Sequence, residues 1–330
     1  MPSITAATAQ EQQQSAPMDE LAAVQQLKCT VARNGSAEAR QNGSSFKPRA
    51  DDVFVATPFK CGTTWMSQVV QSLRSSGDMD FEDIDLVMPY LEFAHDYGIT
   101  NLDVEQRWQP RLFKTHFWRP HCPHGSKAVV VVRDPEDVAP SMFHYYSNWM
   151  FDAGTISLDA FTQQFWTHVP GRRCRREEAS YFHFLASWWP HRNDPNVLFV
   201  TYEDMVADHT AAVERVAKFM FGPDLCNDEL VQTTVQQSSL AAMKQNASKY
   251  DTHTLKLACN EAAGRPKQAG LGAGSTAKVR SGKVGVNKQE LSQESRAAIQ
   301  AAWDAVVAPV SGCASYSELR QALKKESAAA

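Results

Sequence analysis

Apolar runs and amphipathic stretches alternate along this chain. The run DVFVA at 52–56 is β-branched and apolar on both faces, which is typical of a parallel strand covered by helices. Three further runs predict strands at 111–116, 127–135 and 196–205, and helical periodicity predicts helices over 63–78, 136–150, 178–192, 210–222 and 292–307. This order of strands and helices predicts an α/β fold, a single domain with a central parallel β-sheet flanked by helices.

Two stretches lack such periodicity. From about 245 to 288 the chain is rich in Gly, Ser, Ala and Lys, which predicts a long basic loop. The first 45 residues are rich in Ala, Gln and Ser, which favours disorder, with a short helix around 18–27. We therefore expect a disordered extension at 1–45 and one folded domain at 46–325.

Composition narrows the class of protein. Apolar residues make up 43% of the chain and charged residues 21%, as in ordinary soluble globular proteins. The formal net charge of −4 favours neither nucleic acid nor a membrane as partner. The longest apolar runs, such as 128–132, are too short to span a bilayer.

The cysteines and the N-terminal segment indicate in which cellular compartment the protein is expected. Seven widely spaced cysteines form no CxxC pair, which fits a reducing compartment. The N-terminal segment has no apolar core of a secretory signal, and its acidic residues disfavour a transit peptide. A cytoplasmic protein is the expectation, and organelle targeting stays as the weaker alternative.

Residues 57–65, TPFKCGTTW, join the first predicted strand to the first predicted helix. A tight turn between a strand and a helix gathers backbone N–H groups and the positive end of the helix dipole, which together favour an anion. Lys60 adds a positive charge, Gly62 permits close approach, and the two threonines that follow offer hydroxyl groups. The alternative interpretation is a surface turn with an N-cap threonine. The turn is P-loop-like, but its lysine precedes the glycine, unlike GxxxxGK[ST], so the pattern favours transfer from a nucleotide without a metal.

Several segments resemble the motifs of cytosolic-type sulfotransferases, which use 3′-phosphoadenosine-5′-phosphosulfate (PAPS). KCGTTW (60–65) resembles their phosphosulfate loop, and RDPEDVAPSMFHYY (133–146) resembles their 3′-phosphate motif. The other matching segments are PYLEF (89–93), LFKTHF (112–117), VTYEDM (200–205), SSLAAMKQN (238–246) and VRSGKVG (279–285). The resemblance covers about residues 50–290.

The resemblance implies a PAPS site. Its residues would be Lys60, Cys61, Gly62, Thr63, Thr64, Trp65, Arg133, Ser141, Tyr202, Ser238, Arg280, Ser281 and Gly282. Lys60 would stabilise charge on the leaving oxygen, and Trp65 would stack on adenine. Arg133 would hold the 3′-phosphate through two parallel hydrogen bonds, which a lysine cannot form.

The resemblance also implies a reaction. His116 would act as general base on a hydroxyl or amine of a small-molecule acceptor, while Lys60, Lys114 and Ser141 assist around the transferred sulfuryl group. The product would be adenosine 3′,5′-bisphosphate (PAP), and no metal would be needed. The residues expected to bind the acceptor are Tyr90, Phe93, His116, Tyr145 and Trp149, although aromatics at such spacing also suit a plain core.

The sequence departs from the family pattern at a few positions. Leu240 stands where an aromatic often covers adenine, Cys61 replaces a common serine, and Ser281 replaces a lysine. Cys61 could be a reactive thiol or a buried, inert one. The family's C-terminal dimer motif is not recognisable after Lys288, so monomer and homodimer stay open.

Other functions compete with this interpretation. A small-molecule kinase would use ATP and Mg²⁺, and a binding protein would keep only the nucleotide site. The cluster at 116–124 offers three histidines and Cys122, but its spacing fits no common zinc pattern. The basic run at 172–178 is more typical of a solvated loop than of a site for an anionic partner.

Overall fold

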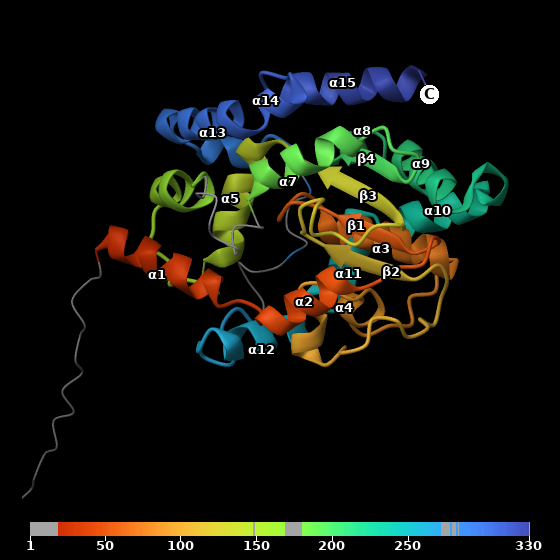
Figure 1. Ribbon diagram of the computed structural model, residues 1–330, viewed down its shortest axis with the longest axis horizontal. Coiled ribbons are helices and arrows are strands. Elements are labelled where there is room, and N and C mark those ends of the chain that lie inside the picture. Colours follow the sequence, from red (N-terminus) through yellow and green to blue (C-terminus); the bar gives the residue numbers. More distant parts are fainter. Residues whose placement is uncertain are drawn as a thin grey trace, which may run out of the picture.

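A four-stranded parallel sheet forms the centre of the molecule (Figure 1). The computed structural model describes residues 19–147, 149–168, 180–271, 278, 282 and 284–329. The strands are β1 (Val53–Ala56), β2 (Leu112–Thr115), β3 (Lys127–Val132) and β4 (Val197–Thr201), and their order across the sheet is β2-β1-β3-β4. Val53 lies opposite Leu112 on one side and Lys127 on the other. The predicted parallel sheet and α/β class are confirmed.

Each strand contributes side chains to two different cores. In β1, Val53 and Val55 join a cluster on one face of the sheet, while Phe54 and Ala56 join a cluster on the other. The first face is covered by the helices α3 (Thr63–Ser75), α9 (His209–Phe221) and α10 (Asp228–Gln237). The second is covered mainly by α7 (Tyr181–Trp188), α13 (Gln293–Val306) and α15 (Tyr316–Ala329). Burial on both faces explains why these strands are apolar throughout.

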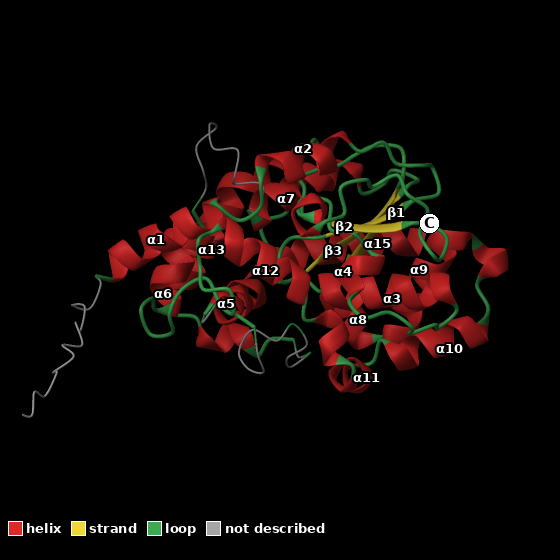
Figure 2. Cartoon of the chain, turned by 90° about the horizontal axis from the view of Figure 1, so that it is seen from below, coloured by secondary structure: helices red, strands yellow, loops and turns green. Residues whose placement is uncertain are grey.

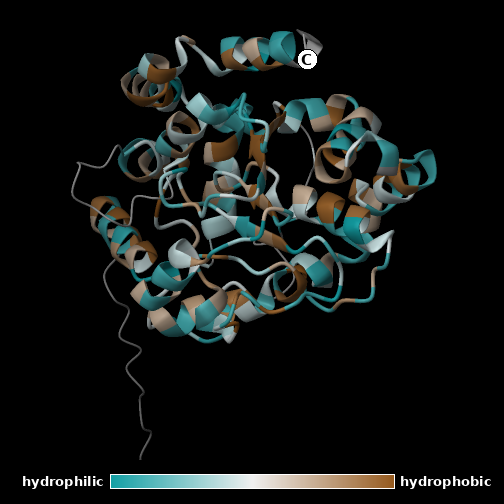
Figure 3. Ribbon diagram, turned by 45° about the vertical axis from the view of Figure 1, so that its right-hand side comes forward, coloured by the Kyte–Doolittle hydropathy of each residue, from teal (hydrophilic) through white to brown (hydrophobic). Residues whose placement is uncertain are grey.

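The other α-helices complete the shell around the sheet (Figure 2). They are α1 (Glu20–Ala32), α2 (Ala37–Ser45), α4 (Ile84–Val87), α5 (Pro135–Tyr146), α6 (Leu158–Ala160), α8 (Tyr202–Ala207), α11 (Leu240–Gln245), α12 (His253–Ala262) and α14 (Ala308–Ser311). Brown and teal residues lie side by side along the helices in Figure 3, as expected where one face packs on a core and the other meets water. Within the described residues, no helix combines the length and the apolar character that crossing a membrane requires.

The fourth strand is shorter than its apolar pattern predicts. The predicted strand runs through 196–205, but β4 ends at Thr201 and α8 begins at Tyr202. The Thr201 side chain accepts a hydrogen bond from the backbone N–H of Asp204, which is an N-cap. This cap turns the chain into a helix and places Tyr202 at the carboxyl edge of the sheet.

The C-terminal half holds helices that the sequence interpretation missed, among them α12 and α15. The predicted loop at 245–288 contains α12, whose Leu255 and Cys259 are buried. Helix α13 matches its prediction but is not the last, because α15 follows it and packs Leu319 and Leu323 into the core.

Helix α15 is also held by polar contacts to α8, the helix that follows β4. The Tyr316 hydroxyl donates to Glu203 over 2.5 Å, and the other oxygen of Glu203 accepts from the backbone N–H of Asp134 over 3.0 Å. Lys324 lies 3.2 Å from the Asp204 carboxylate, which Arg320 also contacts.

The N-terminal segment is ordered where the structure describes it. Disorder was the expectation for residues 1–45, but α1 and α2 occupy most of 20–45, and residues 1–18 lie outside the described part. Val24 and Leu27 of α1 are buried against the aromatic residues that follow β3. Burial of these few apolar side chains overrides a composition that favours disorder.

Candidate active site

The turn between β1 and α3 has the backbone geometry of an anion site. Gly62 has φ = +97° and occupies the N-cap position of α3. A Cβ atom at Gly62 would lie 2.9 Å from Cδ2 of Tyr202, so only glycine fits. Lys60 also has a positive φ of +65°, which is uncommon for a non-glycine residue and typical of a functional turn. The turn therefore aims the N-terminal end of α3 and its first N–H groups at one cavity.

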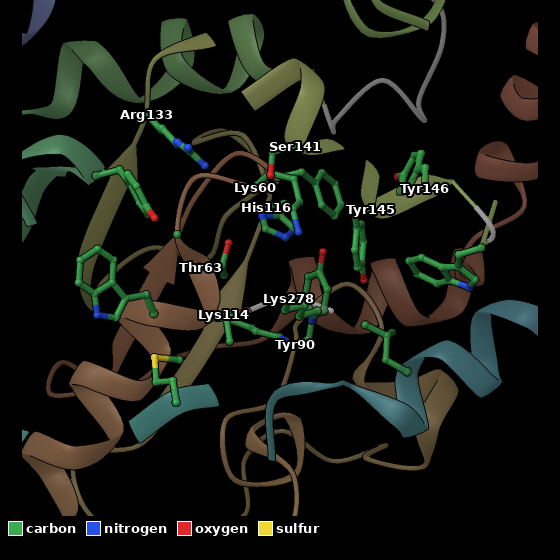
Figure 4. A pocket seen from close by; sticks show the side chains of 18 of the residues that line it. Lys60, Thr63, Tyr90, Lys114, His116, Arg133, Ser141, Tyr145, Tyr146 and Lys278 are labelled. Carbon is green, nitrogen blue, oxygen red and sulfur yellow. The ribbon is translucent and has the colours of Figure 1, made fainter. Parts of the chain in front are cut away.

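One cavity at the carboxyl ends of the strands collects most of the predicted site residues (Figure 4). Those that line it are Lys60, Gly62, Thr63, Thr64, Trp65, Tyr90, Phe93, Lys114, His116, Arg133, Ser141, Tyr145, Trp149, Tyr202, Ser238 and Gly282. Each strand contributes lining residues at or just beyond its carboxyl end, where ligands bind in open parallel sheets. Arg133 lies at one side of the cavity, Tyr145 and Tyr146 lie at the other, and His116 and Lys60 lie between them.

Three predicted site residues are not among those just named as lining the cavity. Cys61 is fully buried in the core, and burial raises the pKa of its thiol well above the usual range. The inert alternative for this cysteine therefore describes it better than the reactive one. Arg280 and Ser281 lie outside the described residues.

The Arg133 side of the cavity has an aromatic and cationic lining. The guanidinium of Arg133 lies 4.3 Å from the centre of the Tyr202 ring and 3.7 Å from the Asp137 carboxylate. The Trp65 indole N–H donates to the Ser238 carbonyl over 2.8 Å. This bond fixes the tryptophan ring edge-on to Tyr202, with 5.4 Å between ring centres. A planar base with a phosphate beside it matches this set of rings and charge.

His116 follows β2 and faces the middle of the cavity. Its Nδ1–H donates to the carbonyl of Thr57, which makes Nε2 the unprotonated nitrogen. Burial, reinforced by the nearby ammonium groups of Lys114, Lys278 and Lys60, lowers the pKa of the imidazole to about 3. The Glu92 carboxylate holds the strand end by accepting from the His116 backbone N–H over 2.5 Å. His116 is therefore a neutral imidazole with a fixed tautomer, and its Nε2 carries the free lone pair.

Lysines surround the imidazole. The Lys60 ammonium lies 4.1 Å from the centre of the Tyr145 ring, and Lys114 forms a buried ion pair with Asp85. Lys278 also lines the cavity, and burial lowers the pKa of its ammonium to about 7. These charges suit an anionic group held at the centre of the cavity.

Sequence reasoning missed Asp85, Lys278 and Asn34 as parts of this site. Asp85 and Lys278 stand in no motif, and Asn34 belongs to the segment taken as disordered. Leu240 does line the cavity, at the position where the family often has an aromatic residue. Only the fold brings Asn34 and Lys278 to the cavity, and Asp85 to Lys114, which lines it.

The competing metal cluster finds no support among the described residues, where no three His, Cys, Asp or Glu side chains are grouped to hold a metal ion. His124 contacts the Arg119 guanidinium, and burial lowers the pKa of its imidazole. The basic run at 172–178 lies outside the described residues.

Comparison with known proteins identifies the family. The sequence profile described as "Sulfotransferase domain" matches residues 50–311, most of the chain. Sulfotransferase 1B1 of the dog (Canis lupus familiaris) is 29% identical over 228 residues, which cover 64% of this chain and 73% of the relative. The amine sulfotransferase of the rabbit (Oryctolagus cuniculus) is 32% identical over 208 residues, which cover 60% of this chain and 65% of the relative.

Solved structures agree on the fold. A mouse sulfotransferase, SULT7A1, complexed with PAP superimposes with a TM-score of 0.59 at 23% identity, covering 82% of this chain and 90% of that one. Retinol dehydratase in a complex with retinol and PAP gives a TM-score of 0.60 at 20% identity, covering 81% and 85% of the two chains. The family that the motifs predicted is confirmed, and the chain belongs to the sulfotransferase family.

Proposed function

We propose that this sulfotransferase takes the sulfuryl group of PAPS and transfers it to a hydroxyl or amine of a small-molecule acceptor, leaving PAP. The observation that carries the proposal is the position of neutral His116 beside Lys60, between the Arg133 and the Tyr145 sides of one cavity. The Arg133 side suits the nucleotide, and the aromatic side suits an apolar acceptor. Related proteins with PAP bound support the choice of nucleotide.

The acceptor oxygen or nitrogen attacks sulfur in line with the bond to the 5′-phosphate. A bond from the acceptor to sulfur forms while the bridging S–O bond breaks, and the electron pair stays on the phosphate oxygen. The acceptor proton passes to Nε2 of His116. Lys60 stabilises the charge that develops on the leaving phosphate.

The remaining residues hold the reactants. Arg133 and Ser141 bind the 3′-phosphate, and the N-terminal end of α3 binds the phosphosulfate through its N–H groups. Trp65 and Tyr202 flank adenine. Lys114 lies beside the transferred sulfuryl oxygens, with Asp85 fixing its ammonium. No residue in this scheme requires a metal ion.

Thermal unfolding with added nucleotides tests the nucleotide site. A ligand that binds only the folded form raises the melting temperature. PAP should raise it, while AMP, which lacks the 3′-phosphate, and ATP with Mg²⁺ should have little effect. A shift with ATP and Mg²⁺ alone would instead favour the kinase alternative.

Turnover of radiolabelled PAPS with a panel of phenols and amines tests the chemistry. His116→Ala should lower turnover by roughly 10²–10⁴-fold, the range typical of a general base, while PAP still shifts the melting temperature. Unchanged turnover in this variant would reject His116 as the base. A protein that binds PAP but transfers no sulfuryl group would support the binding-protein alternative.

A further inference from the structure

The turn between α1 and α2 precedes the matched sulfotransferase domain and still reaches the active-site cavity. Asn34, in this turn, lines the cavity. Ser36 donates to the Asp96 carboxylate through its backbone N–H over 2.8 Å and through its hydroxyl over 2.5 Å. Arg40 donates to the carbonyl of Asn34 over 3.2 Å. The backbone around Asn34 is therefore held in place on its C-terminal side.

The same turn packs against the aromatic side of the cavity. Gly35 has φ = +73°, and a Cβ atom there would lie 2.7 Å from Cε1 of Phe93. Helix α1 buries Val24 and Leu27 in the cluster that contains Tyr145 and Trp149. The N-terminal helices thus form part of the wall at the acceptor side.

The Asn34 amide is incompletely hydrogen-bonded. Its Nδ2 donates to the sulfur of Met150 over 3.6 Å, and thioether sulfur is a weak acceptor. Its Oδ1 is buried and has no hydrogen-bond partner among the described residues. The Tyr90 hydroxyl oxygen is also buried and also lacks a hydrogen-bond partner among these residues. Both residues line the cavity. A buried polar atom without a partner is unfavourable, so a ligand that supplies a hydrogen bond gains affinity there.

We propose that Asn34 determines acceptor specificity by accepting a hydrogen bond from a second polar group of the acceptor, separate from the atom that receives the sulfuryl group. Because amide Oδ1 only accepts, that second group is a hydroxyl or an N–H. The Tyr90 hydroxyl provides another polar contact in the same wall. The acceptor is therefore bifunctional: an apolar body between a nucleophilic hydroxyl or amine and a distal hydrogen-bond donor. This inference rests on the proposed function.

Matched pairs of acceptors test it. Each pair consists of a 4-alkylphenol and the same phenol with a hydroxyl at the end of its alkyl chain, with chains of two to five carbons, and the aryl sulfate formed from PAPS is measured. At one chain length we expect the hydroxyl-bearing member to have a kcat/KM about tenfold higher, the effect of one additional hydrogen bond of ordinary strength. Asn34→Leu should abolish this preference, so that the two members of the pair have nearly equal kcat/KM.

A neighbouring asparagine serves as the control. Asn42 of α2 donates to the carbonyl of Thr100 on the exposed surface, so Asn42→Leu should leave the preference unchanged. PAP should raise the melting temperature of both variants, which shows that each is folded. A preference that survives Asn34→Leu, or no preference in the wild type at any chain length, would overturn the inference and leave the proposed function standing. No turnover of any pair would also overturn it. The proposed function would be overturned as well only if PAP binding were absent or if the wider panel of phenols and amines were not turned over either.

Discussion

Lys114 and Asp85 form an ion pair at the edge of the active-site cavity, with both side chains almost fully removed from water. The Lys114 ammonium also lies 4.8 Å from the centre of the Tyr90 ring. A buried pair of this kind contributes little net stability, but removing one partner leaves the other charge buried alone.

We therefore expect Asp85→Ala to lower the free energy of unfolding by about 3–5 kcal/mol. The exposed pair Lys218–Glu214, separated by 3.7 Å on α9, is the matched control. Glu214→Ala should lower the free energy of unfolding by less than about 1 kcal/mol, because surface ion pairs contribute little. Urea unfolding of both variants measures the difference. Equal losses would show that Asp85 does not compensate a buried charge.

Gly62 and Gly98 allow the role of close packing to be separated from backbone strain. Their φ angles are +97° and +98°, but a Cβ at Gly62 would lie 2.9 Å from Tyr202, whereas one at Gly98 would meet nothing within 4 Å. Alanine should cost roughly 1–2 kcal/mol of stability at either position, because both require a left-handed backbone. Only Gly62→Ala should also displace Tyr202 and abolish the PAP-induced rise in melting temperature. The prediction fails if Gly98→Ala weakens PAP binding equally.

The pKa of His116 makes a specific prediction about acid stability. Its folded-state pKa is about 3, below the ordinary value of 6.5, so the unfolded chain binds the proton more readily. The stabilising contribution is complete above pH 6.5 and is lost progressively as the pH falls toward 3. Between pH 6.5 and 4.5 this loss is roughly 2–3 kcal/mol.

His116→Asn should remove that part of the pH dependence, which unfolding in urea at pH 7, 6, 5 and 4.5 would reveal. Parallel pH profiles for the wild type and the variant would contradict the predicted pKa shift.

Arg133 should discriminate between nucleotides. Its guanidinium is almost fully buried, is flanked by Tyr202 and Asp137, and presents the planar fork that binds phosphate in two places. Arg133→Lys keeps the charge but loses this geometry. We expect the variant to bind PAP at least tenfold more weakly than the wild type, while its weak affinity for AMP is nearly unchanged. Isothermal titration calorimetry with the two nucleotides measures both affinities. An equal loss of affinity for AMP would show that Arg133 does not contact the 3′-phosphate.

The sheet could be predicted because its strands carry an unambiguous pattern. Val53 to Ala56 are buried on both faces, so no polar residue interrupts the run. The end of β4 could not be placed by pattern alone, because VTYEDM continues the run in the sequence while the Thr201 cap starts a helix. The apolar pattern allowed either a longer strand or a helix after Thr201, and the local hydrogen bond of the cap selects the helix.

Helices were missed where composition was averaged over long segments or where the helical spacing was overlooked. Helix α12 is hidden in a stretch whose Gly and Lys residues dominate the average. Helix α15 left a usable signal that was overlooked: Tyr316, Leu319 and Leu323 repeat at helical spacing and are buried together.

The site motifs led to the residues at the strand ends, because a loop that carries chemistry has a recognisable local sequence. Asn34 and Asp85 have no such sequence. Asn34 reaches the cavity through the packing of α1, and Asp85 of α4 reaches Lys114, which lines the cavity. Both are contacts between distant parts of the chain. No spacing along the sequence encodes such contacts.

Helix α15 lies beyond residue 311, where the family match ends. Its Tyr316 hydroxyl donates to one oxygen of Glu203, whose other oxygen holds the backbone N–H of Asp134, the residue after Arg133. A protein truncated at residue 311 would lose this donor and expose the apolar surface that Leu319 and Leu323 cover. We expect the minimal folding unit to extend past the matched domain at both ends, so that domain-based truncation removes support from the nucleotide site.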